Sequence, residues 1–163
     1  MKRFLVLLAL SAACAAANSF AHGDRPETPA RRASPADDGK KPFGQPGAAK
    51  RVTRVVRIDM GDTMRFTPDR IEIKRGETVK FVVANGGKLL HEMVIGTPDG
   101  IREHAALMKK FPGMEHDEPS MAHVQPGKSG EIVWRFTRAG TFQFACLMPG
   151  HFEAGMVGTM VVR

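Results

Sequence analysis

Residues 130–163 read GEIVWRFTRAGTFQFACLMPGHFEAGMVGTMVVR, and this stretch decides the fold that we expect. Residues 130–137 alternate large apolar side chains with polar ones, which is the pattern of a strand with one buried face. A turn at Ala139-Gly140 leads into a second strand pattern at 141–146, and a third, at 158–163, ends the sequence. The sequence therefore predicts consecutive strands, with a loop carrying polar and sulfur side chains before the last one.

Upstream, more segments show strand patterns closed by Gly- or Asn-containing turns, namely residues 52–58, 70–74, 78–85 and 89–95. The exception is 101–111, which has helical composition and stops before Pro112-Gly113. Strands at this spacing indicate an all-β protein built as a β-sandwich of about seven strands, with one short helix inserted before the last strands.

Residues 1–21 have the features of a cleaved signal peptide. Two basic residues begin the segment, an apolar run follows at 4–17, and Ser19-Phe20-Ala21 offers small residues to a signal peptidase. A retained membrane anchor and a lipoprotein attached through Cys14 are the alternatives. The apolar run is short for a bilayer span, and Cys14 lacks the leucine that usually precedes a lipid-bearing cysteine. We therefore expect export to the periplasm, and no membrane span elsewhere in the sequence.

The segment 22–50 is rich in proline, glycine and basic residues and poor in large apolar ones. Such a composition buries too little surface to offset the entropy of ordering, so we expect a disordered basic arm at 22–50 and a folded domain at 51–163. The formal net charge is +7, but no nucleic-acid recognition motif accompanies it, and we expect no nucleic-acid partner. An acidic redox partner, an anionic membrane surface and a basic, solvated tail without specific meaning remain the interpretations of this charge. We expect the protein to be a monomer.

Cleavage of the signal peptide would leave Cys146 as the single cysteine of the exported protein. A lone cysteine cannot form an internal disulfide, so its thiol is either buried and inert or chemically engaged. His151 and Met156 follow it on the same loop between two predicted strands. A thiolate and a thioether favour Cu(I), and imidazole accepts both copper oxidation states. His91, at the end of another predicted strand, offers the second imidazole of a trigonal plane, which leaves Met156 as a weak axial ligand.

These residues resemble the cupredoxins, the family of azurin, pseudoazurin and plastocyanin, over roughly residues 52–163. The upstream motifs that share the resemblance are Phe66-Thr-Pro68, Ile71-Glu-Ile73, Gly76-Glu-Thr-Val79, Phe81 and Asn85. The resemblance implies a Greek-key sandwich and one type 1 copper. A dinuclear centre would need a second cysteine where Gly150 stands, and the oxidases of the family need more histidines and more domains. We therefore expect a mononuclear site and no enzymatic activity.

Two departures from the better-known members limit what the resemblance implies. The gap between Cys146 and His151 resembles azurin, whereas the gap between His151 and Met156 resembles plastocyanin. In both of those proteins an asparagine follows the upstream histidine and braces the cysteine loop, but here Glu92 follows His91. The reduction potential, and whether the site is blue or green, therefore stay open.

The sequence supports two functions. Copper tolerance is favoured by a resemblance to small periplasmic copper-tolerance cupredoxins at 91–93 and 151–156, and by a possible second copper site. An acidic surface loop is the alternative interpretation of that second site, whose candidate ligands are Met114, His116, Met121 and His123. A soluble electron carrier is the other function, since apolar residues around His151 would let a redox partner dock; these are Leu147, Met148, Pro149 and Phe152.

Several lesser candidates for copper binding are weaker. His22 would become the amino terminus after cleavage and could chelate copper with its amine. We expect His104 to be a surface residue of the predicted helix. Three methionines could pass on Cu(I), although core packing explains them more simply; these are Met60, Met64 and Met93.

Overall fold

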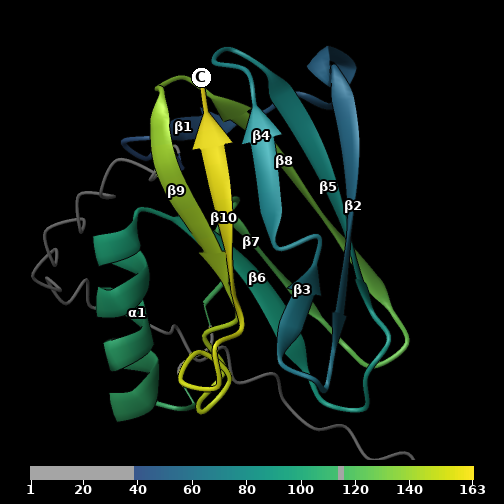
Figure 1. The fold of residues 1–163 in the computed structure, drawn as a ribbon, viewed down its shortest axis with the longest axis vertical. Coiled ribbons are helices and arrows are strands. Elements are labelled where there is room, and N and C mark those ends of the chain that lie inside the picture. Colours follow the sequence, from purple (N-terminus) through teal and green to yellow (C-terminus); the bar gives the residue numbers. More distant parts are fainter. Residues whose placement is uncertain (1–38, 114–115) are drawn as a thin grey trace, which may run out of the picture. The chain divides into compact units, whose positions relative to one another are not determined.

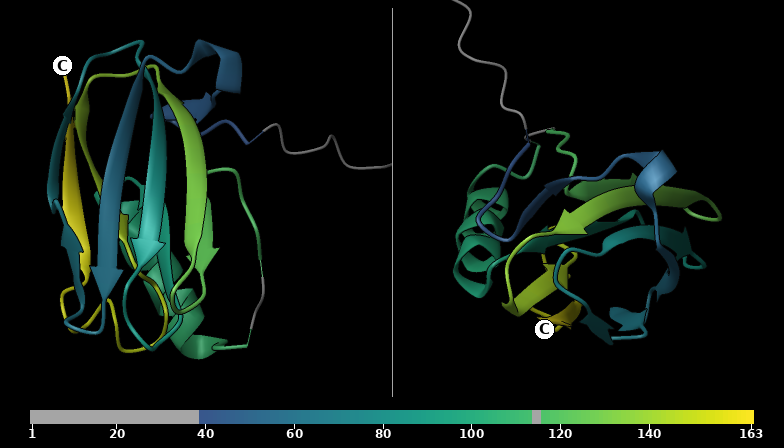
Figure 2. Two further views of the ribbon diagram at one scale, coloured as in Figure 1. Left: turned by 90° about the vertical axis from the view of Figure 1, so that its right-hand side faces the viewer. Right: turned by 90° about the horizontal axis from the view of Figure 1, so that it is seen from above.

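The computed structural model describes residues 39–113 and 116–163. Within them, ten strands form two five-stranded sheets that pack face to face (Figures 1 and 2). The first sheet has the order β1-β8-β5-β2-β3, and the second has the order β4-β10-β9-β6-β7. The strands are β1 Gly44–Pro46, β2 Arg54–Gly61, β3 Arg65–Thr67, β4 Arg70–Ile73, β5 Thr78–Asn85, β6 His91–Gly96, β7 Met121–Val124, β8 Ser129–Phe136, β9 Gly140–Ala145 and β10 Val157–Val162.

The predicted all-β sandwich is confirmed, and its core lies between the sheets. Along β5 and β8, buried residues, most of them apolar, alternate with more exposed residues, so that one face of each strand points into the core. Aromatic side chains fill much of the interior: the Phe66 and Phe144 rings meet edge to face with centroids 5.0 Å apart. Burial of such rings removes large apolar areas from water and supplies most of the favourable free energy of the fold.

The single helix predicted before the last strands is also confirmed, as α1 Pro98–Lys110. It begins three residues before the predicted start because the Thr97 hydroxyl accepts a hydrogen bond from the Gly100 amide at 3.1 Å, and because Pro98 suits the first turn. Ile101 and Met108 are buried and attach the helix to the outer face of the second sheet. Among the described residues, no helix has the length and apolar character needed to span a membrane.

Three strands were not predicted: β1, β3 and β7. The short β1 pairs with β8, and it places Phe43 in the core, 5.3 Å from the Trp134 ring between centroids. Residues 39–50, which the composition assigned to the disordered arm, therefore include an ordered edge strand. The remainder of that predicted arm and the predicted signal peptide lie in residues 1–38, outside the described residues.

Candidate metal centre

Three neighbouring strands of the second sheet bring the predicted ligands together at one end. His91 is the first residue of β6, Cys146 directly follows β9, and Met156 directly precedes β10. Because β9 runs antiparallel to both β6 and β10, the start of β6, the end of β9 and the start of β10 meet at the same edge. The loop from Cys146 to Met156 projects from this edge, below β10 in Figure 1.

Backbone hydrogen bonds fix the shape of this loop. The Cys146 amide donates to the Met156 carbonyl at 3.1 Å and so closes its base. The His151 amide donates to the Met148 carbonyl at 2.9 Å, and the Met156 amide donates to the His151 carbonyl at 3.0 Å. Gly150 has a φ of +89°, a conformation that favours glycine, and it turns the chain just before His151.

The donor atoms converge as a single metal ion requires. Cys146 Sγ lies 3.2 Å from His151 Nδ1 and 3.9 Å from His91 Nδ1. All three ligand atoms lie within 4.8 Å of one another. Met156 is fully buried and belongs to the same core cluster as Cys146. A thiolate, two imidazole nitrogens and a thioether form the donor set of a type 1 copper site, so these residues fit copper.

The Cys146 thiol is deeply buried, and this burial raises its pKa to about 12. The metal-free side chain is therefore a neutral thiol at pH 7, and a bound metal must displace its proton. The Glu92 amide donates a hydrogen bond to Sγ at 3.4 Å, which stabilises negative charge on the sulfur once the proton has left.

A carboxylate that the sequence analysis missed orients His91. Asp62 Oδ1 lies 3.2 Å from His91 Nε2, which directs Nδ1 toward the cysteine. Asp62 also accepts hydrogen bonds from the Lys88 and Leu89 amides; the Lys88 bond is the main cause of the lowered Asp62 pKa. Gly87 leaves room for this arrangement, since a Cβ there would come within 2.1 Å of Oδ1.

Comparison with known proteins agrees with this geometry. The family model described as copper binding proteins, plastocyanin/azurin family, matches residues 52–163. The chain belongs to this family. It is therefore a copper-binding cupredoxin with a type 1 site formed by His91, Cys146, His151 and Met156, and it is not an enzyme.

Two relatives and one solved structure are similar to this chain over most of its length. The chain is 56% identical over 128 residues to the copper-resistant cuproprotein CopI of Rubrivivax gelatinosus, with 78% of each chain covered. It is 38% identical over 161 residues to CopI of Pseudomonas aeruginosa, covering 81% of this chain and 87% of that one. Auracyanin B of Chloroflexus aurantiacus shares the fold, with a TM-score of 0.62 at 20% identity, covering 74% of this chain and 96% of that chain.

Glu92 braces the cysteine loop of this cupredoxin. Its carboxylate Oε1 accepts a hydrogen bond from the Leu147 amide at 2.8 Å, directly after Cys146. Its Oε2 lies 2.8 Å from His123 Nε2. Although the carboxyl group is buried, which raises its pKa, the Leu147 amide and the nearby histidines oppose that shift. Glu92 thus braces the cysteine loop here, and it also contacts a histidine outside the copper site.

His151 lies at the surface side of the site. Burial, followed by the neighbouring His91, lowers its pKa, so the imidazole is neutral and able to bind metal at pH 7. Met148 and Phe152 are half-buried around it, and Pro149 is exposed. Leu147 was expected in this rim, but it is only 1% exposed and packs beneath α1. The apolar surface near His151 therefore consists of Met148, Pro149 and Phe152.

The residues of the predicted second site are placed differently from one another. The His116 and His123 rings lie 6.3 Å apart between centroids, whereas Met121 is buried among the side chains under α1. Met114 lies outside the described residues, as does His22. His104, which we expected to be a surface residue, is half-buried, and its ring centroid lies 4.5 Å from that of His116.

The three methionines considered as Cu(I) carriers contribute to packing. Met60 and Met93 are buried in the core between the sheets, and Met64 packs against that core from its edge. The two buried methionines are almost inaccessible to solvent, and core packing explains their presence.

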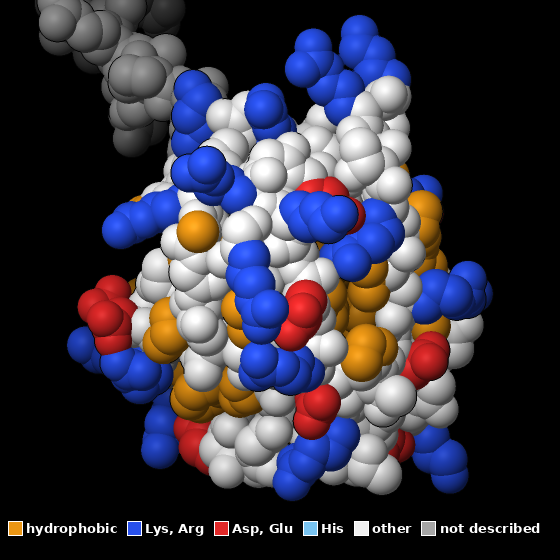
Figure 3. Space-filling view, turned by 45° about the horizontal axis from the view of Figure 1, so that its top comes forward, with side chains coloured by type: hydrophobic (Ala, Val, Ile, Leu, Met, Phe, Trp, Pro, Cys, Tyr) orange, Lys and Arg blue, Asp and Glu red, His pale blue; other side chains and the backbone are white. Residues whose placement is uncertain are grey.

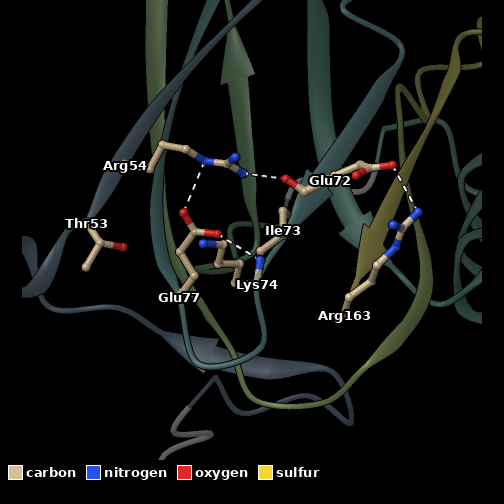
Figure 4. A pocket seen from close by; sticks show the side chains of 7 residues that line it. All are labelled: Thr53, Arg54, Glu72, Ile73, Lys74, Glu77 and Arg163. Atoms are coloured by element: carbon tan, nitrogen blue, oxygen red, sulfur yellow. Dashed lines mark hydrogen bonds and ion pairs between the residues drawn. The ribbon is translucent and has the colours of Figure 1, made fainter.

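The opposite end of the domain has a different character. A surface depression of about 790 Å³ opens there, beside the end of β10 (Figure 4). Both of its arginines pair with glutamates: Arg54 Nε lies 3.2 Å from Glu77 Oε1, and Arg163 Nη2 lies 3.1 Å from Glu72 Oε1. Figure 3 shows basic side chains interspersed with acidic ones over this end. Among the described residues, the lining of this depression contains no group of converging ligand atoms comparable with that of the metal centre.

Proposed function

We propose that this cupredoxin acts in the periplasm and contributes to copper tolerance. The observation that carries this proposal is the 56% identity over 128 residues with a protein named as a copper-resistant cuproprotein. The signal-peptide features of residues 1–21 support the periplasmic location. The copper site supplies the binding capacity that such a role needs.

The site is suited to holding copper away from other reactants. A trigonal His₂Cys site supports both copper oxidation states without large rearrangement. His91, Cys146 and Met156 are all fully buried, so among the four ligands in the described structure His151 alone is partly exposed to solvent. Asp62 and Glu92 hold the donor groups in place before metal arrives. Copper bound here would be shielded from thiols and oxidants that it could otherwise engage in the periplasm.

A gene deletion with complementation tests the tolerance role. The deletion strain should grow poorly in excess copper, and wild-type protein should restore growth, whereas Cys146→Ser should not.

The periplasmic location is tested separately. Fractionation with mass measurement of the purified protein should find it in the periplasm without residues 1–21. Full rescue by Cys146→Ser, or a cytoplasmic protein that retains those residues, would contradict the proposal.

The apolar surface near His151 favours a second candidate function, a soluble electron carrier. Met148 and Phe152 border the imidazole that reaches the surface, as a transient docking site for a redox protein requires. The double change of Met148→Lys and Phe152→Glu should leave copper bound but prevent docking. If copper tolerance is the main role, cells that carry this variant should still grow in excess copper. If electron transfer is the main role, this variant should restore none of the electron transfer that the deletion strain lacks.

A further inference from the structure

A cluster of three histidines lies outside the type 1 site, on the side of the second sheet that α1 covers. His104 comes from α1, His116 from the segment after it, and His123 from β7. The ring centroids of His104 and His116 lie 4.5 Å apart, and those of His116 and His123 lie 6.3 Å apart. The His123 side chain is 35% exposed, so an ion from solution can reach it.

The first pair has nearly the geometry of the two copper-binding imidazoles. The His91 and His151 rings, which share one metal, have centroids 4.9 Å apart and planes tilted by 48°. The His104 and His116 rings are tilted by 53° at their 4.5 Å spacing. Two imidazoles at this spacing and tilt can direct nitrogen atoms to a common ion. His123 is farther away, and the three rings do not bring one ligand atom each together as the type 1 residues do, so the His123 side chain must move before all three can share one ion.

The third histidine, like His91, has a carboxylate against its Nε2 atom. At the type 1 site, the Asp62 carboxylate contacts His91 Nε2 and leaves Nδ1 for metal. At the cluster, the Glu92 carboxylate contacts His123 Nε2 at 2.8 Å and likewise leaves Nδ1 for metal. A carboxylate behind an imidazole fixes its tautomer and raises its basicity as a ligand, and such pairs recur at metal sites.

The surrounding charges also suit a cation. The carboxylates of Glu92 and Glu118 interact with the cluster, and Lys41 offsets part of this negative charge through its 2.8 Å ion pair with Glu118. Burial, and then the neighbouring His116, lower the pKa of His104. That imidazole is therefore neutral at pH 7, which is the form that binds metal.

We propose that His104, His116 and His123 form a second site, which binds one Cu(II) ion, with Glu92 as the positioning residue behind His123. Imidazole donors without a thiolate favour divalent metals, and Cu(II) binds such sites most tightly among the first-row divalent ions. This site keeps His116 and His123 of the set expected from the sequence and adds His104 to them. The proposal goes beyond the tolerance role and does not depend on it.

Copper stoichiometry in the whole protein tests the site. All variants carry His22→Ala, so that the amino terminus does not add a chelate of its own. With this change the protein should bind two Cu(II) per chain, and its EPR spectrum should be the sum of a type 1 signal and a signal from copper without thiolate. Adding His104→Ala and His116→Ala should reduce the binding to one Cu(II) and remove only the second signal.

Two controls separate the site from general effects. Glu103→Ala removes an exposed carboxylate beside His104 on α1 and should leave two Cu(II) bound. The thiolate-to-copper band of Cys146 should persist in every variant, which shows that the domain is folded. Binding of one Cu(II) by the His22→Ala protein would overturn the proposal. So would retention of two Cu(II) after the loss of His104 and His116.

Discussion

The type 1 site and the three-histidine cluster each contain a carboxylate that contacts the Nε2 atom of a histidine. The two regions differ in how far their residues are exposed to solvent. The type 1 ligands project from strand ends and the loop between them, and His91, Cys146 and Met156 are fully buried. The cluster draws its histidines from a helix, a connecting segment and an edge strand, and the His123 side chain is 35% exposed.

This difference separates two kinds of metal binding. The strands and the loop hydrogen bonds hold the type 1 donors together before metal arrives, so little rearrangement accompanies binding. The cluster has to bring His123 closer and is partly exposed to solvent through that residue, so we expect weaker binding and faster exchange. Glu92 belongs to both regions, since it contacts the Leu147 amide with one oxygen and His123 with the other.

Replacing Cys146 with serine should have the largest effect and should separate the two regions completely. A hydroxyl is a poor ligand for copper, so the thiolate-to-copper band should disappear. Absorption spectra and metal analysis of the His22→Ala protein should show the band lost and the stoichiometry reduced from two to one. An intense band that survives this change would contradict the assignment of the type 1 site.

Replacing Asp62 with alanine should weaken copper binding at the type 1 site by about 10- to 100-fold, the usual cost of losing an outer carboxylate. His91 would lose the partner of Nε2 and with it the preference for a free Nδ1. Competition with a copper chelator measures this affinity. Asp59→Ala provides the control, because Asp59 is an exposed carboxylate on β2, the strand that Asp62 directly follows, and it has no hydrogen bond to His91. An equal loss in both variants would refute the orienting role of Asp62.

Prediction from the sequence succeeded for features that depend on a short stretch of chain and failed for those that depend on contacts between distant residues. Cys146, His151 and Met156 were predictable as ligands because one short loop carries all three. Strands such as β5 were predictable because an alternating pattern is a local property. The role of Asp62 was not predictable, since its contact with His91 joins residues 29 positions apart.

The edge strand β1 and the position of His104 show the same difficulty. β1 consists of Gly-Gln-Pro, which has no strand pattern, and it forms because β8 offers it hydrogen bonds and the core accepts Phe43. His104 looked like a solvent-exposed helical residue, and only the path of the chain after α1 brings His116 against it. Local patterns therefore identified the ligands, whereas tertiary contacts decide what supports them.

Replacing Met156 with leucine should leave the coloured copper site in place and raise its reduction potential. The change nearly conserves volume in the buried cluster, so the free energy of unfolding should fall by less than about 1.5 kcal/mol. Loss of the thioether removes a donor that supports Cu(II). Redox titration monitored at the visible band measures the potential. Loss of copper altogether would show that Met156 is a primary ligand and not a weak axial one.

The smallest effect at the type 1 site should come from Glu92→Gln, which tests whether Glu92 orients His123. The glutamine oxygen can still accept the Leu147 amide, so the visible band should persist with little shift. Its amide nitrogen would then face His123 Nε2 as a donor, which moves the imidazole proton to Nδ1, the atom left for the second ion. Affinity of the cluster for Cu(II) should therefore fall by about 10- to 100-fold, as measured by titration of protein already loaded at the type 1 site. The opposite result would be an unchanged affinity of the cluster for Cu(II) together with loss of the visible band. It would show that Glu92 supports the cysteine loop alone. The resemblance between the two carboxylate–imidazole pairs would then have no bearing on metal binding.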